Sequence, residues 1–510
     1  MKKTWRKWGI ALCAVLAALL VGCQAVSGLN FDDVILKQLD VKSAEQSGTV
    51  DVAIDWNPDF LETMDPQEAK LLGLLGQISL KIDKAQVDAQ NRISYAGSLA
   101  FGGKKPVNFK FLMDSERMLL SVEGAKKPLL IDLGEADMPM TNQLEEPVRQ
   151  LMKEAAGYFV HHLPNPEKLS ASREWTSVNG QSTGLTKLHA EFDGQELGDL
   201  LLRYVDALAG DEDGLRAMLE SVAGQLSGLP PELLWELTGD ENPTAEDLKD
   251  WAEEGVQTLI PELKEAQAEL AKAKGSLEWS LVFDKGTQLK ADFYVDDSLQ
   301  LRKSDMDLKI APAVFSMSGF PVRSIAVRTH SEIWNVNGNV SVPAIETPAD
   351  ALTPDELDGL SASGFLRNLE EGSPIYDLLK NELQIDDTSF ELDGYSFYDT
   401  PPVIERNGSK ASVQLPIRET LEGFEDSFTY NHPTREIRFT DEGTGQEIVL
   451  TIGSSEAVVN GSKVQLAEPV HLNGSYAYMG ADDLTKLLKA TYTYAEEDDG
   501  FLTVTVSRDL

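Results

Sequence analysis

The chain of 510 residues carries 84 acidic and 45 basic side chains, which gives a formal net charge of −39. This charge excludes nucleic acid as a partner, because binding to nucleic acid requires lysine and arginine to neutralise phosphates. Hydrophobic residues make up 42% of the chain and charged residues 25%, which is typical of globular proteins and excludes wholesale disorder. The length leaves room for two to four domains.

The first 22 residues have the pattern of a secretory signal peptide. Basic residues at positions 2, 3, 6 and 7 precede an apolar run from Trp8 to Val21, and small residues follow it. A helix rises about 1.5 Å per residue, so the run is too short to cross the roughly 30 Å hydrocarbon core comfortably. We therefore expect cleavage, with an uncleaved transmembrane anchor as the alternative.

The run ends in Leu20-Val21-Gly22-Cys23, which resembles the lipobox of bacterial lipoproteins. That motif has an aliphatic residue three places before a cysteine and a small residue directly before it. The resemblance implies cleavage between Gly22 and Cys23, after which Cys23 bears lipid and residues 23–30 form a tether. Two acyl chains hold a protein at a membrane where one releases it. The mature protein is then expected on the extracytoplasmic face of the cell membrane of a Gram-positive bacterium, lipid-anchored through Cys23.

Strands are predicted at the start of residues 31–345. Apolar residues alternate with polar ones at 50–56, 78–82, 107–111 and 118–122. A period of two indicates half-buried strands. Consecutive strands of this kind usually pair antiparallel and leave one face in water.

From about Thr141 the spacing of apolar residues becomes helical. The pattern predicts helices near 144–159, 197–208 and 215–226. A longer helix is expected after Pro243, where Thr244 and Asp247 have the spacing of a capping box. Pro261 should kink or restart this helix, because proline lacks the amide that the helix needs.

Strands are predicted again in the rest of this region. The alternating segments are 277–283, 289–295, 299–301, 306–310, 324–336 and 339–342. Asn337-Gly338 lies between the last two, and this pair favours a type I′ hairpin. Strands, a helical block and further strands together indicate an α+β fold with a curved antiparallel sheet.

This order of elements in a lipoprotein resembles the lipoprotein-carrier superfamily of half-barrels. In that superfamily a curved antiparallel sheet wraps helices around an apolar cavity. The resemblance covers roughly residues 31–345 and implies an apolar, lipid-like ligand. The alternative is that the helices simply fill the concave face of the sheet, because fold does not imply function.

A connector is predicted over residues 346–387. Prolines, a glycine and several acids are concentrated between 343 and 361, a composition typical of linkers. A short helix is expected near 375–383. A second domain follows at 388–510.

The second domain contains a hairpin and an internal repeat of about 65 residues. Asn460-Gly461 lies between two alternating strands, which is the strongest short hairpin signal. Pro402-Val403-Ile404 corresponds to Pro469-Val470-His471, and each is followed by Asn-Gly, a short helix and two further strands. The domain is therefore expected to be a smaller α+β unit made of two similar halves.

Several stretches of this domain resemble the copper amine oxidase N-terminal-like, or stalk, domain. They are Ile452-Gly453-Ser454, Val459-Asn460-Gly461 and Asn473-Gly474. Leu415-Pro416-Ile417-Arg418 also looks like that family's Val-Pro-Leu-Arg turn into a helix. The second half departs from the family at this turn, where it has Tyr478-Met479-Gly480-Ala481.

The residues do not support a copper or other cofactor site. Amine oxidase chemistry belongs to a separate domain with a tyrosine-derived cofactor in an Asn-Tyr motif, and this chain has no Asn-Tyr pair. No two histidines form a His-x-His pair that could start a copper site; the six are His161, His162, His189, His330, His432 and His471. Arg418 is expected to pair with an acid beside its helix. We predict no metal and no cofactor.

Two further patterns are interpreted as structural. His161-His162 ends a predicted helix, where positive charge suits the helix dipole. Asp211, Asp213, Gly214 and Glu220 resemble part of an EF-hand loop, but Ala209 stands at the place of its first carboxylate. We expect a solvated turn between two helices there.

The sequence predicts a protein that is not an enzyme. It has no Gly-x-Ser-x-Gly elbow, Walker loop or His-Glu-x-x-His motif, so no catalytic residue is nominated. The leading hypothesis is a surface-anchored lipoprotein whose stalk-type domain contacts the envelope, with a cell-wall polymer or a surface protein as partner. The alternative is a carrier of an apolar ligand in residues 31–345, with unknown binding residues. An enzyme that acts on wall polymers is the third possibility.

Overall fold

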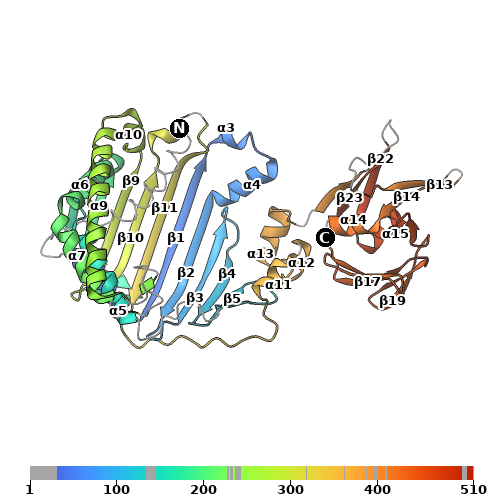
Figure 1. Ribbon diagram of the computed structural model, residues 1–510, viewed down its shortest axis with the longest axis horizontal. Coiled ribbons are helices and arrows are strands. Elements are labelled where there is room, and N and C mark those ends of the chain that lie inside the picture. The colour runs from blue at the N-terminus through green and yellow to red at the C-terminus, as the bar shows by residue number, and fades with distance from the viewer. Residues whose placement is uncertain are drawn as a thin grey trace. The chain divides into compact units, whose positions relative to one another are not determined.

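The computed structural model describes residues 31–133, 145–226, 229, 234–235, 243–317, 319–360, 362–385, 388–393, 400–407, 410–496 and 502–508. Its contacts divide the chain into two compact units (Figure 1). The first unit comprises Met1–Leu120 and Asp132–Glu346, and the second comprises Ser121–Ile131 and Thr347–Leu510. Gly22 and Cys23, the predicted cleavage and lipidation residues, lie outside the described residues.

One large, mostly antiparallel sheet of 11 strands dominates the first unit, in the order β6-β5-β4-β3-β2-β1-β11-β10-β9-β8-β7. The first and last strands of the unit are neighbours at its centre, paired from Glu45 opposite Trp334 to Ile54 opposite Ile325. The strands are β1 (Ala44–Trp56), β2 (Gln77–Val87), β3 (Ile93–Phe101), β4 (Val107–Met113), β5 (Arg117–Val122), β6 (Leu129–Asp132), β7 (Lys168–Val178), β8 (Gln181–Asp193), β9 (Gln288–Val295), β10 (Leu301–Ile310) and β11 (Val322–Trp334).

The strands predicted at 50–56, 78–82, 107–111, 118–122, 289–295, 306–310 and 324–336 are confirmed, and four others were missed. The missed strands are β3, β6, β7 and β8. Gly97 in the middle of β3 interrupts the alternation of apolar residues that predicts a strand, and glycine normally weakens a strand. It is needed there because a Cβ atom at this position would lie 2.1 Å from the carbonyl oxygen of Lys81 on β2.

The strand predicted at 277–283 is wrong, because the structure has helix α10 (Leu277–Val282) there. Ser276 caps this helix by accepting a hydrogen bond from the amide of Trp279 (3.1 Å). The rings of Trp279 and Phe283, four residues apart as helical neighbours are, lie 4.3 Å apart. The alternating apolar residues do not share one buried face, since Leu277 is 69% exposed whereas Trp279 and Phe283 pack into one buried cluster.

The hairpin predicted at Asn337-Gly338 is also wrong, and residues 339–342 form no strand. β11 already pairs with β1 on one edge and with β10 on the other, so no edge is left for a further strand. Asn337 has a φ of 53°, as a type I′ turn requires, but its turn does not connect two strands. Its amide donates to the carbonyl oxygen of Ser43 (2.7 Å), which fastens the chain to the start of β1.

Helices cover part of one side of the sheet (Figure 1). Those predicted near 144–159, 197–208 and 215–226 are confirmed as α5, α6 and α7. The helices of this unit are α2 (Phe31–Gln38), α3 (Pro58–Leu61), α4 (Pro66–Leu75), α5 (Glu145–His161), α6 (Gly194–Gly210), α7 (Glu212–Leu226), α9 (Ala245–Ala273) and α10, with a 3-10 turn η1 (Ala313–Ser316).

The capping box at the start of α9 is confirmed, because the side chains of Thr244 and Asp247 each bond the other's backbone amide. Of the two outcomes expected at Pro261, a kink or a restart, the restart is wrong, since Pro261 lies inside α9, a single helix of 29 residues. Leu248, Val256 and Ile260 of α9 are buried against Leu215 and other residues of α7. This packing stabilises the helix enough to tolerate the hydrogen bond that proline removes.

The connector consists of short helices: α11 (Pro354–Asp358), α12 (Ala362–Arg367), α13 (Pro374–Tyr376) and the π-helical turn η2 (Asp377–Glu382). The helix predicted near 375–383 is therefore confirmed. Backbone bridges join the connector to the turn after β5, at Ala125 with Leu369, and to the first residue of β6, at Leu129 with Leu352. The segment Ser121–Ile131, from the end of β5 into β6, accordingly belongs to the second unit.

The rest of the second unit, residues 388–508, is called the C-terminal module. It has three small sheets in the orders β12-β23-β22, β13-β14-β21-β20 and β15-β16-β17-β18-β19. Its elements are β12 (Thr388–Leu392), β13 (Val403–Asn407), β14 (Lys410–Pro416), α14 (Ile417–Gly423), β15 (Phe428–Asn431), β16 (Glu436–Asp441), β17 (Gln446–Thr451), β18 (Glu456–Val459), β19 (Ser462–Gln465), β20 (His471–Asn473), β21 (Tyr476–Gly480), α15 (Ala481–Leu487), β22 (Thr491–Glu496) and β23 (Leu502–Arg508).

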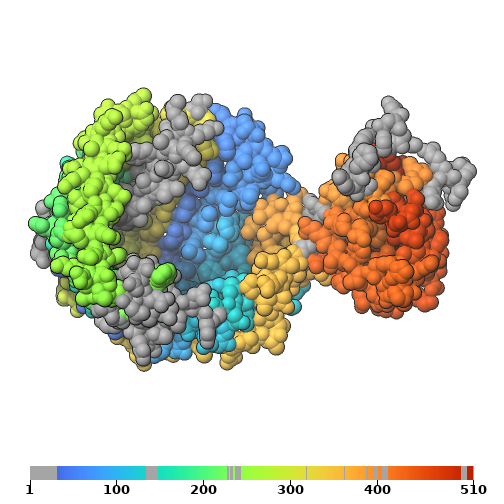
Figure 2. Space-filling model, in the orientation of Figure 1, coloured from blue at the N-terminus to red at the C-terminus, as the bar shows by residue number. Residues whose placement is uncertain are grey.

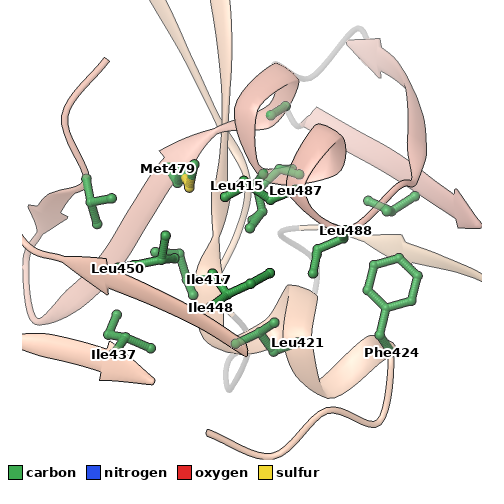
Figure 3. Close-up of a cluster of buried hydrophobic side chains, with 14 of the residues drawn as sticks. Leu415, Ile417, Leu421, Phe424, Ile437, Ile448, Leu450, Met479, Leu487 and Leu488 are labelled. Carbon is green, nitrogen blue, oxygen red and sulfur yellow. The ribbon is translucent and has the colours of Figure 1, made fainter. Parts of the chain in front are cut away.

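The internal repeat is confirmed in the structure of the C-terminal module. Each half has two strands, a helix and two strands: β13-β14-α14-β15-β16 and β20-β21-α15-β22-β23. The halves meet where Leu415 of β14 pairs with Met479 of β21, two residues that hold equivalent positions before their helices. Both are fully buried in one shared core with Leu421, Ile448 and Leu450 (Figure 3).

The hairpin predicted at Asn460-Gly461 is confirmed between β18 and β19. The φ angles of these two residues are 48° and 77°, and a type I′ turn requires positive values at both positions.

Candidate functional site

The candidate site is one face of the large sheet, called the inner face. On β1 it carries Val50, Val52 and Ile54, and directly paired residues continue the same face onto neighbouring strands. Val52 lies opposite Val327 of β11 on one side and Ile78 of β2 on the other. Because side chains alternate across a strand, Asp51 and Asp55 point to the opposite, outer face.

The inner face is apolar across five strands. On β2 and β3, Ile78 pairs with Phe101 and Leu80 with Leu99. On β4, Phe111 stands opposite Tyr95, and their ring centroids lie 5.8 Å apart. Besides Val107, which pairs with Leu99, twelve apolar residues of this stretch are Ile325, Val327, Val50, Val52, Ile54, Ile78, Leu80, Ile82, Leu99, Phe101, Phe109 and Phe111.

Among the described helices, those that pack into a buried cluster on this face do so at its β8–β10 end. There Leu197 and Leu200 of α6 and Phe283 after α10 form a buried cluster with Phe192 and Leu289 of the sheet. Met306, Leu308 and Ile310 of β10 pack at the margin of that cluster. The cluster ends at β10, although the apolar face continues through β11 to β4.

The twelve apolar residues of the inner face from β11 to β4 belong to none of the five buried hydrophobic clusters. Eleven of them are half-buried, and Val50 is 36% exposed. Figure 2 shows the first unit hollowed between α9 and the strands β1 to β3. A contiguous apolar surface of this kind is what a binding site for an apolar molecule offers.

The outer face of the same sheet is charged, with opposite charges placed directly across neighbouring strands. Such cross-strand pairs each contribute about 0.2–1 kcal/mol, and they explain why this face is stable in water. One row runs Lys168, Glu191, Lys290, Asp307, Arg328 and Asp51.

A second row of the outer face contains two histidine–aspartate pairs. Nδ1 of His189 lies 2.7 Å from Oδ1 of Asp292, and Nδ1 of His330 lies 2.6 Å from Oδ1 of Asp305. Burial lowers the pKa of Lys187, but its hydrogen bond to Asp292 leaves that pKa above the usual value. Within the described part of the chain, no group of three or more His, Cys, Asp or Glu is placed to hold a metal ion.

The helix that follows the predicted tether is fastened to α5 by charged groups. Asp40, just after α2, accepts ion pairs from Arg149 (3.0 Å) and Lys153 (2.5 Å). Its hydrogen bond with Lys153 lowers the pKa of the Asp40 carboxyl below the usual value, although partial burial opposes this. Nδ1 of His161 lies 2.9 Å from Oδ2 of the buried Asp32. The start of the described chain is thus held firmly.

The sequence expectation of a plain turn at Asp211 is confirmed. Only this residue separates α6 from α7, and its side chain accepts a hydrogen bond from the amide of Gly214 (3.0 Å). Asp213, Gly214 and Glu220 lie within α7, so there is no twelve-residue loop of the EF-hand kind. Nε2 of His162 lies 3.0 Å from Oδ2 of Asp211 and ties α5 to this turn.

A polar pocket of about 920 Å³ lies between α6, the end of α9 and the adjacent ends of β7, β8 and β9. Its lining includes Asp199, Arg203, Lys274, Glu191 and Lys290. Lys274 pairs with Asp199 at 2.8 Å and joins α9 to α6. With a mainly charged lining, this pocket does not suit an apolar ligand, in contrast to the inner face.

In the C-terminal module, the expected ion pair of Arg418 is confirmed. Its Nη1 atom lies 3.7 Å from Oε1 of Glu422, one turn further along α14, and both side chains are 58% exposed. The guanidinium also lies 4.9 Å from the ring centroid of Phe428. Arg418 therefore has a structural role at the surface.

The sequence predicted no binding residues, because it does not show which part of the inner face the helices cover. The alternation in β1, β2 and β4 was recognised, but a half-buried strand looks the same whether a helix or a ligand covers it. Among the described residues, no helix is long and apolar enough to cross a membrane.

Comparison with known proteins identifies one part of the chain. A search of the curated proteins found no match. The model of the family described as "Copper amine oxidase N-terminal domain" matches residues 391–502, within the C-terminal module. The Asn460-Gly461 hairpin and the confirmed repeat from β13 to β22 lie in that range. Residues 391–502 are therefore a copper amine oxidase N-terminal domain, a stalk-type domain that fits a non-catalytic role.

Proposed function

We propose that this protein is a non-enzymatic lipoprotein, anchored through Cys23 on the extracytoplasmic face of the cell membrane, whose first unit binds an apolar, acyl-chain-like ligand. The inner face carries this proposal. It presents twelve apolar side chains from five neighbouring strands that none of the buried clusters includes. The outer face of the same strands is charged, so the sheet is built with one side suited to water and one to an apolar partner.

The chemistry of the ligand follows from the shape and composition of the inner face. The surface is several strands wide, at about 4.8 Å per strand, and suits an extended chain better than a compact polar molecule. Burial of one methylene contributes about 0.8 kcal/mol. Roughly ten methylenes laid on this face would supply about 8 kcal/mol, so micromolar affinity is the upper limit before the cost of ordering the chain is subtracted.

The predicted tether supports a lipid as ligand. Seven residues, Gln24 to Asn30, separate Cys23 from α2, and at about 3.3–3.6 Å per residue they reach at most about 25 Å. Val34 of α2 is buried against Leu188 and Val295 of the sheet, so α2 cannot extend the tether without breaking this contact. An anchored first unit therefore stays beside the membrane that would supply the ligand.

The ligand hypothesis is tested with two substitutions at adjacent positions of β1. Val52→Gln places an amide on the inner face, where an unpaired polar group costs about 1–3 kcal/mol. We expect the Kd for a fluorescent fatty acid, cis-parinaric acid, to rise at least about fivefold. Ala53→Gln places the same group on the exposed outer side and should leave the Kd unchanged.

Titration of the full chain followed by fluorescence gives both affinities. Equal affinity of the two variants and the unchanged protein would remove the inner face as the binding site. Native mass spectrometry of the purified protein, which should show a stoichiometric lipid, tests the same proposal without a variant.

A second proposed role is envelope contact through the C-terminal module, and its exposed apolar side chains favour it. Leu472 on β20 and Tyr476 on β21 are 50% and 49% exposed, at the end of a two-stranded hairpin where Asn473 pairs with Tyr476. Exposed aromatic side chains with an amphipathic ring are typical anchors of binding surfaces. We propose a cell-wall polymer as the partner.

The envelope role predicts that the full chain sediments with purified cell-wall sacculi and that Tyr476→Ser reduces the bound fraction severalfold. Tyr430→Ser is the matched control, because Tyr430 is similarly exposed (48%) but lies on β15 of another sheet. Binding that is lost equally in both variants contradicts the hairpin as the contact. Binding to a surface protein and not to sacculi would show that the partner is a protein and not a cell-wall polymer.

A further inference from the structure

Three charged side chains are buried together in the C-terminal module. Asp426 is 2% exposed, Asp441 0% and Arg508 3%. Asp426 lies between α14 and β15, Asp441 ends β16 and Arg508 ends β23. The group therefore joins the first half of the repeat to the last strand of the second half.

Arg508 and Asp441 form a tight pair in this group. Nη1 of Arg508 donates to Oδ1 of Asp441 at 2.5 Å, and the guanidinium lies 4.0 Å from the ring centroid of Phe424. The other oxygen of Asp441 accepts hydrogen bonds from the amide of Thr444 (3.0 Å) and from its hydroxyl. The charge of Asp441 is thus fully compensated.

Asp426 has no such compensation. Its Oδ1 atom accepts one hydrogen bond, from the amide of Glu442 (2.8 Å). Its Oδ2 atom is buried without a hydrogen-bond partner, and so is Nε of Arg508. The charged side chains that act on the Asp426 carboxyl are Asp441 and Arg508, and Glu442 contributes its amide.

With both carboxyls ionised, this group of three side chains lacks one positive charge. Two carboxylates and one guanidinium leave a net charge of −1 in the interior, and burial of an uncompensated charge costs several kcal/mol. A single proton makes the group neutral. It also gives the Asp426 carboxyl a hydrogen-bond donor, so that the proton can be shared with the neighbouring carboxyl of Asp441, as in other buried carboxyl pairs.

We infer that the C-terminal module folds with one proton bound at the Asp426–Asp441 pair, so that its stability falls when this proton is lost at rising pH. The proton is a structural ligand of the module and joins three segments that are distant in the sequence. Because Arg508 is paired with Thr388 across β23 and β12, loss of the proton loosens the strand with which the module begins.

The electrostatics agree with this geometry. Burial raises the pKa of the Asp426 carboxyl from 3.8 to about 7, and the neighbouring Asp441 adds to the rise. The folded module thus binds the proton more tightly than the unfolded chain. The stabilisation is complete below a pH of about 4, declines as the pH rises and is lost above about 7, with the unfolding constant rising up to tenfold per pH unit in between.

Native-state hydrogen exchange of the full chain, measured by mass spectrometry, tests the inference because it reports local opening. After correction for intrinsic exchange, the opening constant of β16, β17 and β23 should rise severalfold per pH unit between about 5 and 7. Asp426→Asn mimics the protonated carboxyl, so it should abolish this dependence and open less than the unchanged protein at pH 8. Glu447→Gln, an exposed acid of β17, should keep the full dependence.

Two results would overturn the inference. One is an opening constant of the unchanged module that does not vary with pH, and the other is an unaltered dependence in Asp426→Asn. If that variant does not fold, infrared spectroscopy of the unchanged protein decides. At pH 6, where exposed carboxyls are ionised, a protonated buried carboxyl must be detected, and its absence contradicts the proposal. Every tryptophan precedes residue 388, so tryptophan fluorescence reports separately on the first unit.

Discussion

Arg508→Met is expected to lower the free energy of unfolding of the C-terminal module by about 3–5 kcal/mol, because removal of one partner from a buried ion pair leaves the other charge uncompensated. In this case two carboxyls, Asp426 and Asp441, lose the buried cation beside them. Methionine keeps much of the volume above Phe424, so the effect comes mainly from the lost charge. Hydrogen exchange in β16 and β23 measures it in the full chain.

Arg438→Met is the matched control for this prediction. Arg438 pairs with Glu436 at 2.8 Å, but the two side chains are 50% and 24% exposed, and pairs of this kind contribute about 0–1 kcal/mol. Combining Arg508→Met with Asp441→Asn removes both charges and should recover part of the loss. A loss for Arg508→Met no larger than that for Arg438→Met would show that the buried pair contributes nothing.

Cys23→Ala is expected to abolish lipid attachment completely. Cys13 and Cys23 are the two cysteines of the chain, and the first would leave with the signal, so no other thiol of the mature protein can accept a diacylglyceryl group. A single acyl chain gives only marginal, reversible membrane binding, so the proposed anchor depends on both chains of this one residue. Incorporation of labelled palmitate and the mass of the mature protein are the measurements.

Cys13→Ala supplies the control, since it changes the other cysteine of the chain, which lies within the apolar run. It should leave both the palmitate label and the mature mass as they are. Label that persists in Cys23→Ala, or an unchanged protein whose mass includes residues 1–22, would contradict the anchor and leave an ordinary exported or inserted protein.

The sequence predicted those parts of the fold whose pattern is set locally. The capping box at Thr244, the Asn460-Gly461 turn and the repeat around Leu415 and Met479 each depend on a few neighbouring residues, and each is confirmed. Predictions failed where tertiary contacts decide the outcome. Residues 277–283 alternate like a strand but form a capped helix, and α9 continues through Pro261 because α7 holds it in place.

The candidate site was predictable only in part. Alternation indicates which residues of β1 share a face, but which strands the helices cover depends on where α6 and α10 pack, and this is not visible in the spacing. The buried charges were hidden for a different reason. Asp426, Asp441 and Arg508 are common surface residue types, and 67 residues separate the last two in the sequence. Only the folded core reveals that they are enclosed together.

The central pairing of β1 with β11 has a mechanical consequence. Glu45 near the start of β1 lies opposite Trp334 at the end of β11, so the chain enters and leaves the sheet at the same end of two antiparallel strands. Tension between the residues before β1 and those after β11 would unzip this pair one hydrogen bond at a time instead of shearing all of them together. Resistance to pulling must then come from the fastenings outside the sheet, namely Asp40 with Arg149 and Lys153, and the amide of Val342 on Asp88 (3.3 Å).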